Sequence, residues 1–584
     1  MGPGGNGSVE ASVQVADVGD PQLRASGVVP DRRRVLLYLL LLAALVVVTF
    51  GRSGSFQFVM WDDDRMLYAN PHVHGLTAAN LHWMFTDSTY NRLYMPLGWL
   101  GYALSVALVG LNAPAQHLVN VGLHLVNVLL LFALLRELLK AARSPVSAGW
   151  QDFAAAAGAA LWAVHPLRVE AVAWVGARVH LMMAVFLLAG LWMYLRSVQR
   201  AADRRQLMWG RPLFWAAVAG YGLSLLTFPA GLLLPAVLVV LDVYILGRAE
   251  GEPRRGPAWA RLIVEKWPMF LLAMAAIAVS VWGRFHTQTM AHAAGVDTFG
   301  VGSRLMQAFY VCAYYVAATL WPTHLSPVYT TLVRFSPDEP LFVFSAAAVV
   351  GITVVLFAMR RRWPTAWAAW LCHLLVLLPF LGLTEHPDYT SDRYTYGEGV
   401  IYSALVAGWL ASGRVALHVR KMAAVAAGVI VVGLAALSFG QVAVWRDTPT
   451  LYAYVLQELN GDPYGLDIHL RWARYALQQG DAAAALREAD AVLVQAPKVP
   501  TAAELRGQAL ELAARQGSQR GLSLAEVREL YLAAGAAFRR AFVLRPTRPL
   551  LEQAAAAYEA GGNPAAAAEL RAAETPDGGP PPPR

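Results

Sequence analysis

Residues 35–50 read VLLYLLLLAALVVVTF, carry no charged side chain and directly follow the basic cluster Arg32–Arg34. A run of this kind approaches the length that a helix needs to cross the hydrocarbon core of a bilayer. Similar apolar runs recur along the chain as far as Gly440 and stop after Trp445. We therefore expect a membrane-embedded domain over residues 35–445, and we expect the rest of the chain to lie outside the bilayer.

The composition supports a membrane protein and argues against a nucleic-acid-binding one. Only 15% of the residues are charged, the mean hydropathy is +0.43 and the formal net charge is +8. Soluble domains carry about 25% charged residues. Most of the basic residues lie in short loops between apolar runs, which is typical of membrane topology and predicts no nucleic-acid partner. Cys312 and Cys372 lie in apolar segments, so neither a disulfide framework nor a zinc site is expected.

Both ends of the chain have the composition of disordered segments. Residues 1–34 are polar and Gly-rich up to the Arg cluster, which resembles the basic region of a signal sequence. No convincing small-residue cleavage site follows Phe50, so we predict an uncleaved signal anchor with a cytoplasmic N-terminus. Residues 573–584 form a Pro-rich tail that we expect to be disordered.

The number of spans follows from the positive-inside rule, which assigns loops rich in Lys and Arg to the cytoplasm. Six basic clusters are then cytoplasmic: Arg32–Arg34, residues 136–143, 196–211, 248–261, Arg360–Arg362 and 414–421. Each pair of cytoplasmic clusters must be separated by an even number of crossings. We therefore assign the short segments 96–111 and 306–321 to the outer surface.

Eleven spans remain, and the odd count places the C-terminus outside. They are residues 35–50, 117–138, 152–166, 169–195, 213–228, 230–247, 267–283, 341–358, 364–382, 397–412 and 422–440. Two large outer loops, residues 51–116 and 284–340, follow from this topology. We expect a multi-pass protein, of a bacterial inner membrane, whose tail is periplasmic.

Residues 446–572 show the spacing of a helical repeat domain. Gly480, Ala485, Ala489, Leu493 and Pro497 follow the tetratricopeptide pattern, and a second match ends in AAFRRAFVLRP. Ala-rich amphipathic helices without the repeat are the alternative. Because both Gly and Pro fall in register, we favour an α-solenoid of tetratricopeptide repeats, whose groove would hold an acceptor protein or peptide. The predicted fold is all-α, a membrane helix bundle followed by this solenoid.

The first outer loop opens with an acidic triplet, Asp62, Asp63 and Asp64, beside several aromatic residues. Like charges this close raise the pKa of at least one carboxyl group, and such a group can serve as a general base. A solvated acidic loop is the alternative interpretation.

The predicted span 169–195 and its entry carry ionisable residues, which are costly inside a membrane. Glu170, Arg178 and His180 belong to this group, and His165 marks the outer end of the preceding span. These residues face either a functional cavity or a buried structural ion pair. Glu170 and Arg178 lie two helical turns apart, so they would need an intermediary to pair.

The last polar outer loop reads TEHPDYTSDRYTYGEG and contains Asp392, Arg393, Tyr394 and Tyr396. An Arg in this position can neutralise a phosphate. An interfacial aromatic belt with snorkelling charges is the alternative. The topology places this loop, His165 and the acidic triplet on one face, as a single active site requires.

Several stretches in series resemble the membrane-embedded glycosyltransferases of the GT-C fold. The stretches include WDDDRMLYANPHVHGLTAANLHWMFT, LWAVHPLRVEAVAWVGAR, YYVAATLWPTHLSPVY, SDRYTY and QVAVWRDTPTLY. Within that fold, the chain is most similar to the transmembrane proteins with tetratricopeptide repeats, whose eukaryotic members are protein O-mannosyltransferases. The resemblance covers nearly all of residues 35–500.

The resemblance implies transfer of a hexose from a polyprenyl phosphate to a hydroxyl group, with inversion. It makes Asp62 or Asp63 the base and Asp64 a support. The other implied residues are His165, Arg178 and Arg393 against the donor phosphate, with Glu170, His180, Asp392, Tyr394 and Tyr396 in support. Asp62 and Asp64 also form a DxD pattern. That pattern normally serves nucleotide-sugar enzymes with a soluble α/β domain, so we expect no required metal and no cofactor.

Two positions depart from the family pattern. His180 stands where the family usually has an acidic residue, and Phe228 stands where it commonly has Lys before Pro. These changes leave open a catalytically inactive scaffold whose repeats bind extracytoplasmic partners. A lipid or polysaccharide transporter is a third possibility, although the chain shows no repeated halves. The sugar, the acceptor and the oligomeric state do not follow from the sequence.

Overall fold

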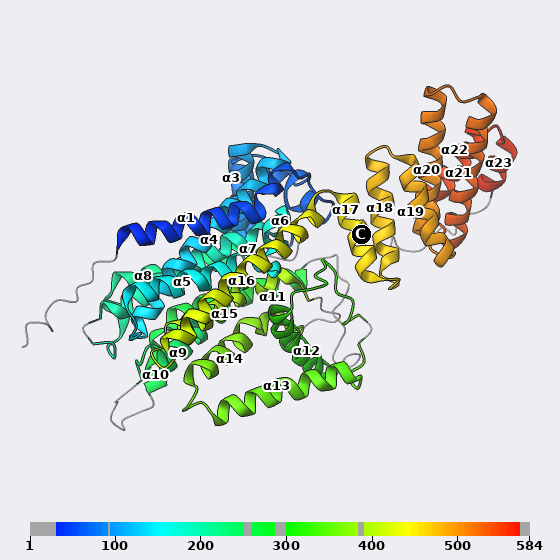
Figure 1. The fold of residues 1–584 in the computed structure, drawn as a ribbon. Coiled ribbons are helices and arrows are strands. Elements are labelled where there is room, and N and C mark those ends of the chain that lie inside the picture. Colours follow the sequence, from blue (N-terminus) through cyan, green and yellow to red (C-terminus); the bar gives the residue numbers. More distant parts are fainter. Residues whose placement is uncertain are drawn as a thin grey trace, which may run out of the picture.

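The computed structural model describes residues 31–90, 94–201, 203–249, 258–286, 300–333, 335–383 and 390–572. Over these residues the chain forms helices and no β-strand, so the fold is all-α as the sequence predicts. A bundle of helices is followed by a row of helices that extends beyond one end of it (Figure 1). The predicted disordered ends, apart from residues 31–34, lie outside the described residues.

The helices of the membrane part begin at clear sequence signals. Asp31 and Asn112 cap α1 and α4 through their side chains, and Pro opens α3, α8, α13 and α14. In chain order the helices are α1 (Arg32–Phe50), α2 (Ala78–Thr86), α3 (Pro96–Val109), α4 (Ala113–Ala141), α5 (Ala148–Ala163), α6 (Val169–Ala173), α7 (Arg178–Gln199), α8 (Pro212–Thr227), α9 (Leu234–Tyr244), α10 (Ala258–Glu265), α11 (Trp267–His286), α12 (Val301–Leu320), α13 (Pro340–Ala358), α14 (Pro364–Leu377), α15 (Thr395–Leu410) and α16 (Leu417–Val442).

Within the described residues, five helices are long and apolar enough to cross a membrane. They are Arg32–Ser55, Ala113–Ala141, Val175–Gln199, Pro340–Ala358 and Leu417–Trp445. A sixth candidate is the pair α10 and α11, which is bent by 61°. The chain is therefore a multi-pass membrane protein. Shorter apolar helices such as α8, α9 and α14 match further expected spans, and the total of eleven remains a prediction.

The predicted continuous span 169–195 is wrong, because the helix breaks between α6 and α7. Trp174 is extended, and the chain resumes a full helix only at Arg178. Side chains from other elements satisfy the backbone groups that the break exposes. Asn120 donates to the Trp174 carbonyl at 2.9 Å, and Tyr102 donates to the Gly176 carbonyl at 2.8 Å. A break at membrane depth is tolerated where buried protein groups provide such partners.

Two other predicted boundaries also differ. The segment 306–321, which we expected to be short, belongs to the 20-residue helix α12. That helix ends at Leu320, and Trp321 caps it before Pro322. The predicted span 152–166 ends earlier, because α5 stops at Ala163 and a separate turn follows from Pro166. The residue before a proline is biased away from helical geometry, which sets both ends.

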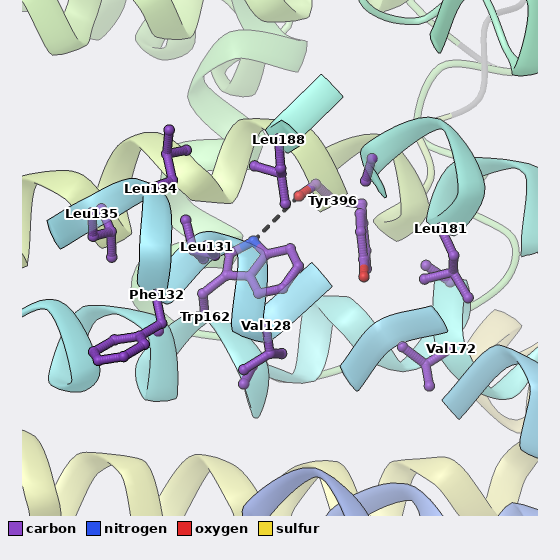
Figure 2. Packing of buried hydrophobic residues seen from close by; sticks show 14 of the residues in the cluster. Val128, Leu131, Phe132, Leu134, Leu135, Trp162, Val172, Leu181, Leu188 and Tyr396 are labelled. Atoms are coloured by element: carbon purple, nitrogen blue, oxygen red, sulfur yellow. Dashed lines mark hydrogen bonds between the residues drawn. The ribbon is translucent and has the colours of Figure 1, made fainter. Parts of the chain in front are cut away.

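The core of the bundle lies where α4, α5, α7 and α15 meet (Figure 2). Trp162 of α5 packs among Val128 and Leu131 of α4 and Leu188 of α7, and its indole nitrogen donates to the Tyr396 carbonyl at 3.2 Å. The same face of α4 carries, mostly nearer its N-terminus, a row of buried polar side chains: Gln116, Asn120, His124 and Asn127. Asn120 attaches α4 to the break between α6 and α7, and Asn127 attaches it to α7 through the Leu181 carbonyl.

A fully buried ionic cluster joins α9, α10 and α11 at the end of the bundle away from the repeats in Figure 1. Arg248 contacts Asp242 at 2.9 Å and Glu265 at 2.7 Å. Lys266 contacts the same two carboxylates at 2.5 and 3.0 Å. Two cations and two carboxylates balance, so the cluster is buried without net charge. It fixes the sharp bend between α10 and α11.

The C-terminal helices form consecutive antiparallel pairs. They are α17 (Thr448–Leu459), α18 (Gly465–Gln478), α19 (Ala482–Gln495), α20 (Pro500–Gln519), α21 (Leu524–Leu544), α22 (Arg548–Ala560) and α23 (Pro564–Ala572). Gly480 has a φ of +74° in the turn before α19, where a Cβ atom would be strained. Ala485 and Ala489 are fully buried where the helices touch. The small residues and the turn Gly therefore act as the repeat pattern requires, and the tetratricopeptide assignment stays a prediction.

Candidate functional site

Asp63 is the buried anchor of the acidic loop, which we define as residues 56–70. Its two carboxylate oxygens accept hydrogen bonds from the backbone N–H groups of Val59 at 2.9 Å and Gly176 at 2.8 Å. The side chain is fully buried. Burial raises the pKa of Asp63 to about 7, and this effect outweighs the two hydrogen bonds and the nearby Arg178. The expected rise in pKa is therefore present, but desolvation rather than the neighbouring Asp64 is its main cause.

The other two members of the triplet lie differently. Asp62 is exposed and has a φ of +65°, which side chains with a Cβ atom seldom adopt. Asp64 is half-buried and begins the short helical turn η3 (Asp64–Tyr68). Burial, and to a smaller extent the charges of Asp64 and Asp63, raise the pKa of Tyr68 to about 12. Within the triplet, the Asp62 side chain is therefore exposed and the Asp63 side chain is buried.

Arg178 is buried directly beneath the acidic loop. Its guanidinium donates to Asn120 Oδ1 at 2.7 Å, to Ser105 Oγ at 2.5 Å and to the Gln116 carbonyl at 2.8 Å. It also lies over the Tyr102 ring, 5.2 Å from the centroid. All of its described hydrogen-bond acceptors are neutral, so the charge of Arg178 acts on the nearby Asp63 without a direct ion pair.

Glu170 and Arg393 form the ion pair that the sequence left undecided. Arg393 Nη1 lies 2.6 Å from Glu170 Oε1, and the Arg393 backbone N–H donates to Glu170 Oε2 at 2.7 Å. The guanidinium packs against the Trp174 ring at 5.2 Å and the Tyr394 ring at 5.0 Å. Glu170 therefore pairs with the distant loop rather than with Arg178, because the break after α6 turns α7 away from it.

Asp392 is a second buried carboxyl group next to this pair. Its Oδ1 accepts a hydrogen bond from the Tyr329 hydroxyl at 2.8 Å. Burial and the charge of Glu170 raise the pKa of Asp392 well above its ordinary value. Asp392 therefore accepts a hydrogen bond from a neutral hydroxyl group, while Glu170 is the carboxyl group that pairs with Arg393.

A large apolar cavity of about 900 Å³ runs through the bundle next to this ion pair. Its walls are mostly Leu, Val, Ala and Ile from α4, α7, α9, α14 and α15. His180, Arg393, Tyr394 and Tyr396, which the sequence predicted, line its polar end, and Arg362 and Arg414 from the loops after α13 and α15 also line the cavity. The rings of His180 and Phe228 lie 4.4 Å apart at this end. Apolar walls with a cationic side chain among them suit an apolar ligand that carries an anionic group.

The turn Trp174–Ala177 connects the cavity to the acidic loop. Asp63 bonds the turn at Gly176, and Arg393 packs on the same turn at Trp174. The acidic loop and Arg393, which lines the cavity, therefore contact the same turn. His165 lies apart from them, because its Nε2 contacts the Thr319 carbonyl at 3.0 Å and its Nδ1 accepts from the Leu167 N–H at 3.3 Å.

Several residues that shape this site were missed by the sequence analysis. Trp174 packs against Arg393 and stacks on Trp445, and Tyr329 holds Asp392. For Asn120 a signal existed, because the polar residues of α4 recur at helical spacing within an apolar segment. Among the described residues, no group of three or more His, Cys, Asp or Glu side chains is arranged to hold a metal ion.

Comparison with known proteins gives distant relatives. The chain is 32% identical over 169 residues to protein O-mannosyl-transferase TMTC1 of Mus musculus, which is 27% of this chain and 17% of the mouse protein. It is 33% identical over 182 residues to protein O-mannosyl-transferase Tmtc2 of Drosophila melanogaster, covering 30% and 17% of the two chains. It is 30% identical over 200 residues to protein O-mannosyl-transferase TMTC2 of Homo sapiens, covering 32% and 22%.

The alignments therefore span less than a quarter of these relatives' own length. No family model and no solved structure matches the chain.

Proposed function

We propose that this chain is a membrane glycosyltransferase that moves a hexose from a polyprenyl-phosphate donor to a hydroxyl group of a protein or envelope acceptor. The observation that carries the proposal is the apolar cavity lined by Arg393, whose ion pair with Glu170 lies on the same turn as the acidic loop. The names of the distant relatives support the same class of reaction. Following the charge pattern of the loops, the reaction takes place on the extracytoplasmic face of a bacterial inner membrane.

The donor's isoprenoid chain is a ligand of the chemistry that the cavity wall suits. Its phosphate would lie against Arg393, which lines the polar end of the cavity and can donate two parallel hydrogen bonds. Glu170 and the Trp174 ring hold the guanidinium in place. The guanidinium of Arg178 already donates to other protein groups, so in this proposal it would stabilise the phosphate through its charge and not through a hydrogen bond.

In the proposed reaction a carboxylate of the acidic loop removes the proton of the acceptor hydroxyl. The acceptor oxygen attacks the anomeric carbon, and the bond from that carbon to the phosphate oxygen breaks, so the configuration inverts. The electron pair leaves with the polyprenyl phosphate, whose charge Arg393 stabilises. Asp62 is the better base, because it is exposed while both oxygens of Asp63 accept backbone hydrogen bonds. The step requires no metal.

The proposed acceptor approaches from the side of the repeat helices. Their first member, α17, lies against the acidic loop through the contact of Tyr452 with Met60. An acceptor peptide held by the repeats would therefore reach the loop without leaving the protein surface.

A second candidate function is a membrane-anchored scaffold without catalysis. The observation that favours it is the packing of His180 on Phe228 at the polar end of the cavity, where the resemblance leads us to expect charged residues. Aromatic rings in this place reduce the positive charge available to a phosphate.

The test is transfer from polyprenyl-phosphate mannose or glucose to envelope proteins by the full-length protein in nanodiscs. We expect transfer by the wild type and a loss of at least about 100-fold in Asp62→Asn, the usual contribution of a general base. Arg393→Gln should also abolish transfer, and it leaves Glu170 buried without its partner. The double variant Arg393→Gln/Glu170→Gln restores charge balance, so it should fold as the wild type does and remain inactive.

A wild type that transfers neither hexose to any envelope protein, together with an unchanged glycoproteome in a deletion strain, would favour the scaffold. Full activity of Asp62→Asn and Asp63→Asn would contradict the assignment of the base to the acidic loop.

A further inference from the structure

The acidic loop is attached to the C-terminal repeat domain as well as to the membrane bundle. The Gln57 N–H donates to the Arg446 carbonyl at 2.9 Å, just before α17 begins. Both backbone polar groups of Met60 are bound by α17, since its N–H donates to Thr448 Oγ1 at 3.0 Å and its carbonyl accepts from the Tyr452 hydroxyl at 2.6 Å. Thr448 and Tyr452 are themselves fully buried. Hydrogen bonds from the start of the repeat domain therefore hold the main chain of the loop immediately before the acidic triplet.

The side chain next to the triplet is also held by the repeat helices. The Trp61 ring lies 6.2 Å from the Tyr452 ring in an edge-on arrangement, and the Arg471 guanidinium of α18 lies 5.5 Å from the Trp61 ring centroid. Arg471 is oriented in turn by Asp467 at 2.7 Å. Two successive helices of the repeat domain thus contact the residue that precedes Asp62.

On its other side the loop is attached to the membrane bundle by Asp63. The Asp63 carboxylate accepts one hydrogen bond from the Gly176 N–H, in the turn before α7, and another from the Val59 N–H within the loop. Asp62 lies between the two attachments, exposed and with a φ of +65°. A residue with a Cβ atom adopts this region at a steric cost, which is smaller for Asp than for most residue types.

We propose that α17 is a positioning clamp which, with Asp63, holds Asp62 in its outward, left-handed conformation, so that Thr448 and Tyr452 are positioning residues for the acidic loop. The inference rests on the proposed function, because it assigns Asp62 the proton transfer. It gives the repeat domain a second role besides acceptor binding. Without α17, the Asp62 carboxylate would lose its fixed orientation.

The first test is hydrogen–deuterium exchange of the full-length protein in nanodiscs, read on peptides that cover residues 57–61. Thr448→Val and Tyr452→Phe each remove one hydrogen bond to Met60, so the amides of this segment should exchange at least about fivefold faster. Tyr454→Phe is the matched control on the same helix. Its hydroxyl group donates to the Leu325 carbonyl and does not contact the acidic loop.

The second test is kinetic. The two clamp variants should lower kcat about fivefold and leave the KM for the lipid donor unchanged, because the donor cavity does not contact α17. Thr448→Ser keeps the hydroxyl group and should restore kcat, whereas a general loss of folding would not be rescued in this way. Faster exchange without any change in kcat would overturn the positioning role.

The third test does not depend on activity. Asp62→Gly removes the steric cost of the positive φ, so the Tm of this variant should be higher than that of the wild type. In the Thr448→Val/Tyr452→Phe background the loop is free to relax, so the gain should fall to less than half. Equal gains in both backgrounds would contradict the clamp. If the wild type shows no transferase activity, the proposed function fails, while exchange and Tm still decide whether the clamp exists.

Discussion

A single carboxyl group, Asp63, combines full burial with two backbone hydrogen bonds, and burial raises its pKa to about 7. In an unfolded chain an Asp releases its proton near pH 4. The folded protein therefore binds an additional proton between these two values. The contribution of Asp63 to the free energy of unfolding is full below about pH 4 and is lost as the pH rises through about 7.

We predict that the Tm of the wild type, measured in nanodiscs, falls across this range more steeply than the Tm of Asp63→Asn. The Asn side chain does not titrate, and it replaces one acceptor by a donor opposite a backbone N–H, so the variant should be the less stable of the two at low pH. The difference in Tm between the two proteins should shrink as the pH approaches neutrality. Parallel curves would mean that Asp63 is ionised throughout.

Arg178 illustrates how one residue can be identified correctly and its contacts missed. An Arg in a predicted span has to face a partner or a cavity. The structure provides neutral partners for it, Ser105, Gln116 and Asn120, from two other helices. Nothing in the local sequence indicates this pairing, because the partners lie 58 to 73 positions away along the chain.

At the scale of elements, the bend between α10 and α11 depends on the buried cluster of Asp242, Arg248, Glu265 and Lys266. Arg248→Met leaves two buried carboxylates with a single cation. We predict a loss of about 3–5 kcal/mol in the free energy of unfolding, as is usual when one partner of a buried ion pair is removed. Thermal or denaturant unfolding in a mild detergent measures the loss.

The matched variants separate charge balance from the loss of a large side chain. Arg248→Met/Glu265→Gln leaves Asp242 and Lys266 as a balanced pair, so it should recover most of the stability. Arg211→Met is the control for the loss of an Arg near the same surface, since the Arg211 guanidinium donates only to the Arg200 carbonyl among its described contacts. If Arg248→Met is as stable as Arg211→Met, the cluster does not hold the bend.

At the scale of the whole molecule, the orientation in the membrane follows from the charged loops and can be measured directly. We predict that a cysteine at Asp87, in the first outer loop, reacts with an impermeant thiol reagent added to intact cells. A cysteine at Asp203, between α7 and α8, should be protected until the membrane is opened. The native Cys312 and Cys372 are buried and should give a low background. The reverse labelling pattern would invert the topology.

The sequence determined the class of the protein and much of its organisation. In a bilayer a continuous apolar run satisfies its backbone polar groups as a helix, whereas a barrel strand alternates apolar and polar residues. The all-α membrane bundle therefore follows from residues such as 35–50 without any tertiary information. The turn Gly480 and the buried Ala485 and Ala489 likewise identify helix pairs from spacing alone, because small residues are needed wherever two helices touch.

Only the tertiary structure decided which of the candidate site residues lie together. Glu170 pairs with Arg393, 223 positions away, and Asp63 bonds Gly176, 113 positions away. The break at Trp174 that permits both contacts looks helical in the sequence, and it exists because buried side chains from α3 and α4 satisfy its backbone. Polar contacts between distant segments depend on the packing of the whole bundle, and periodicity within one segment carries no information about them.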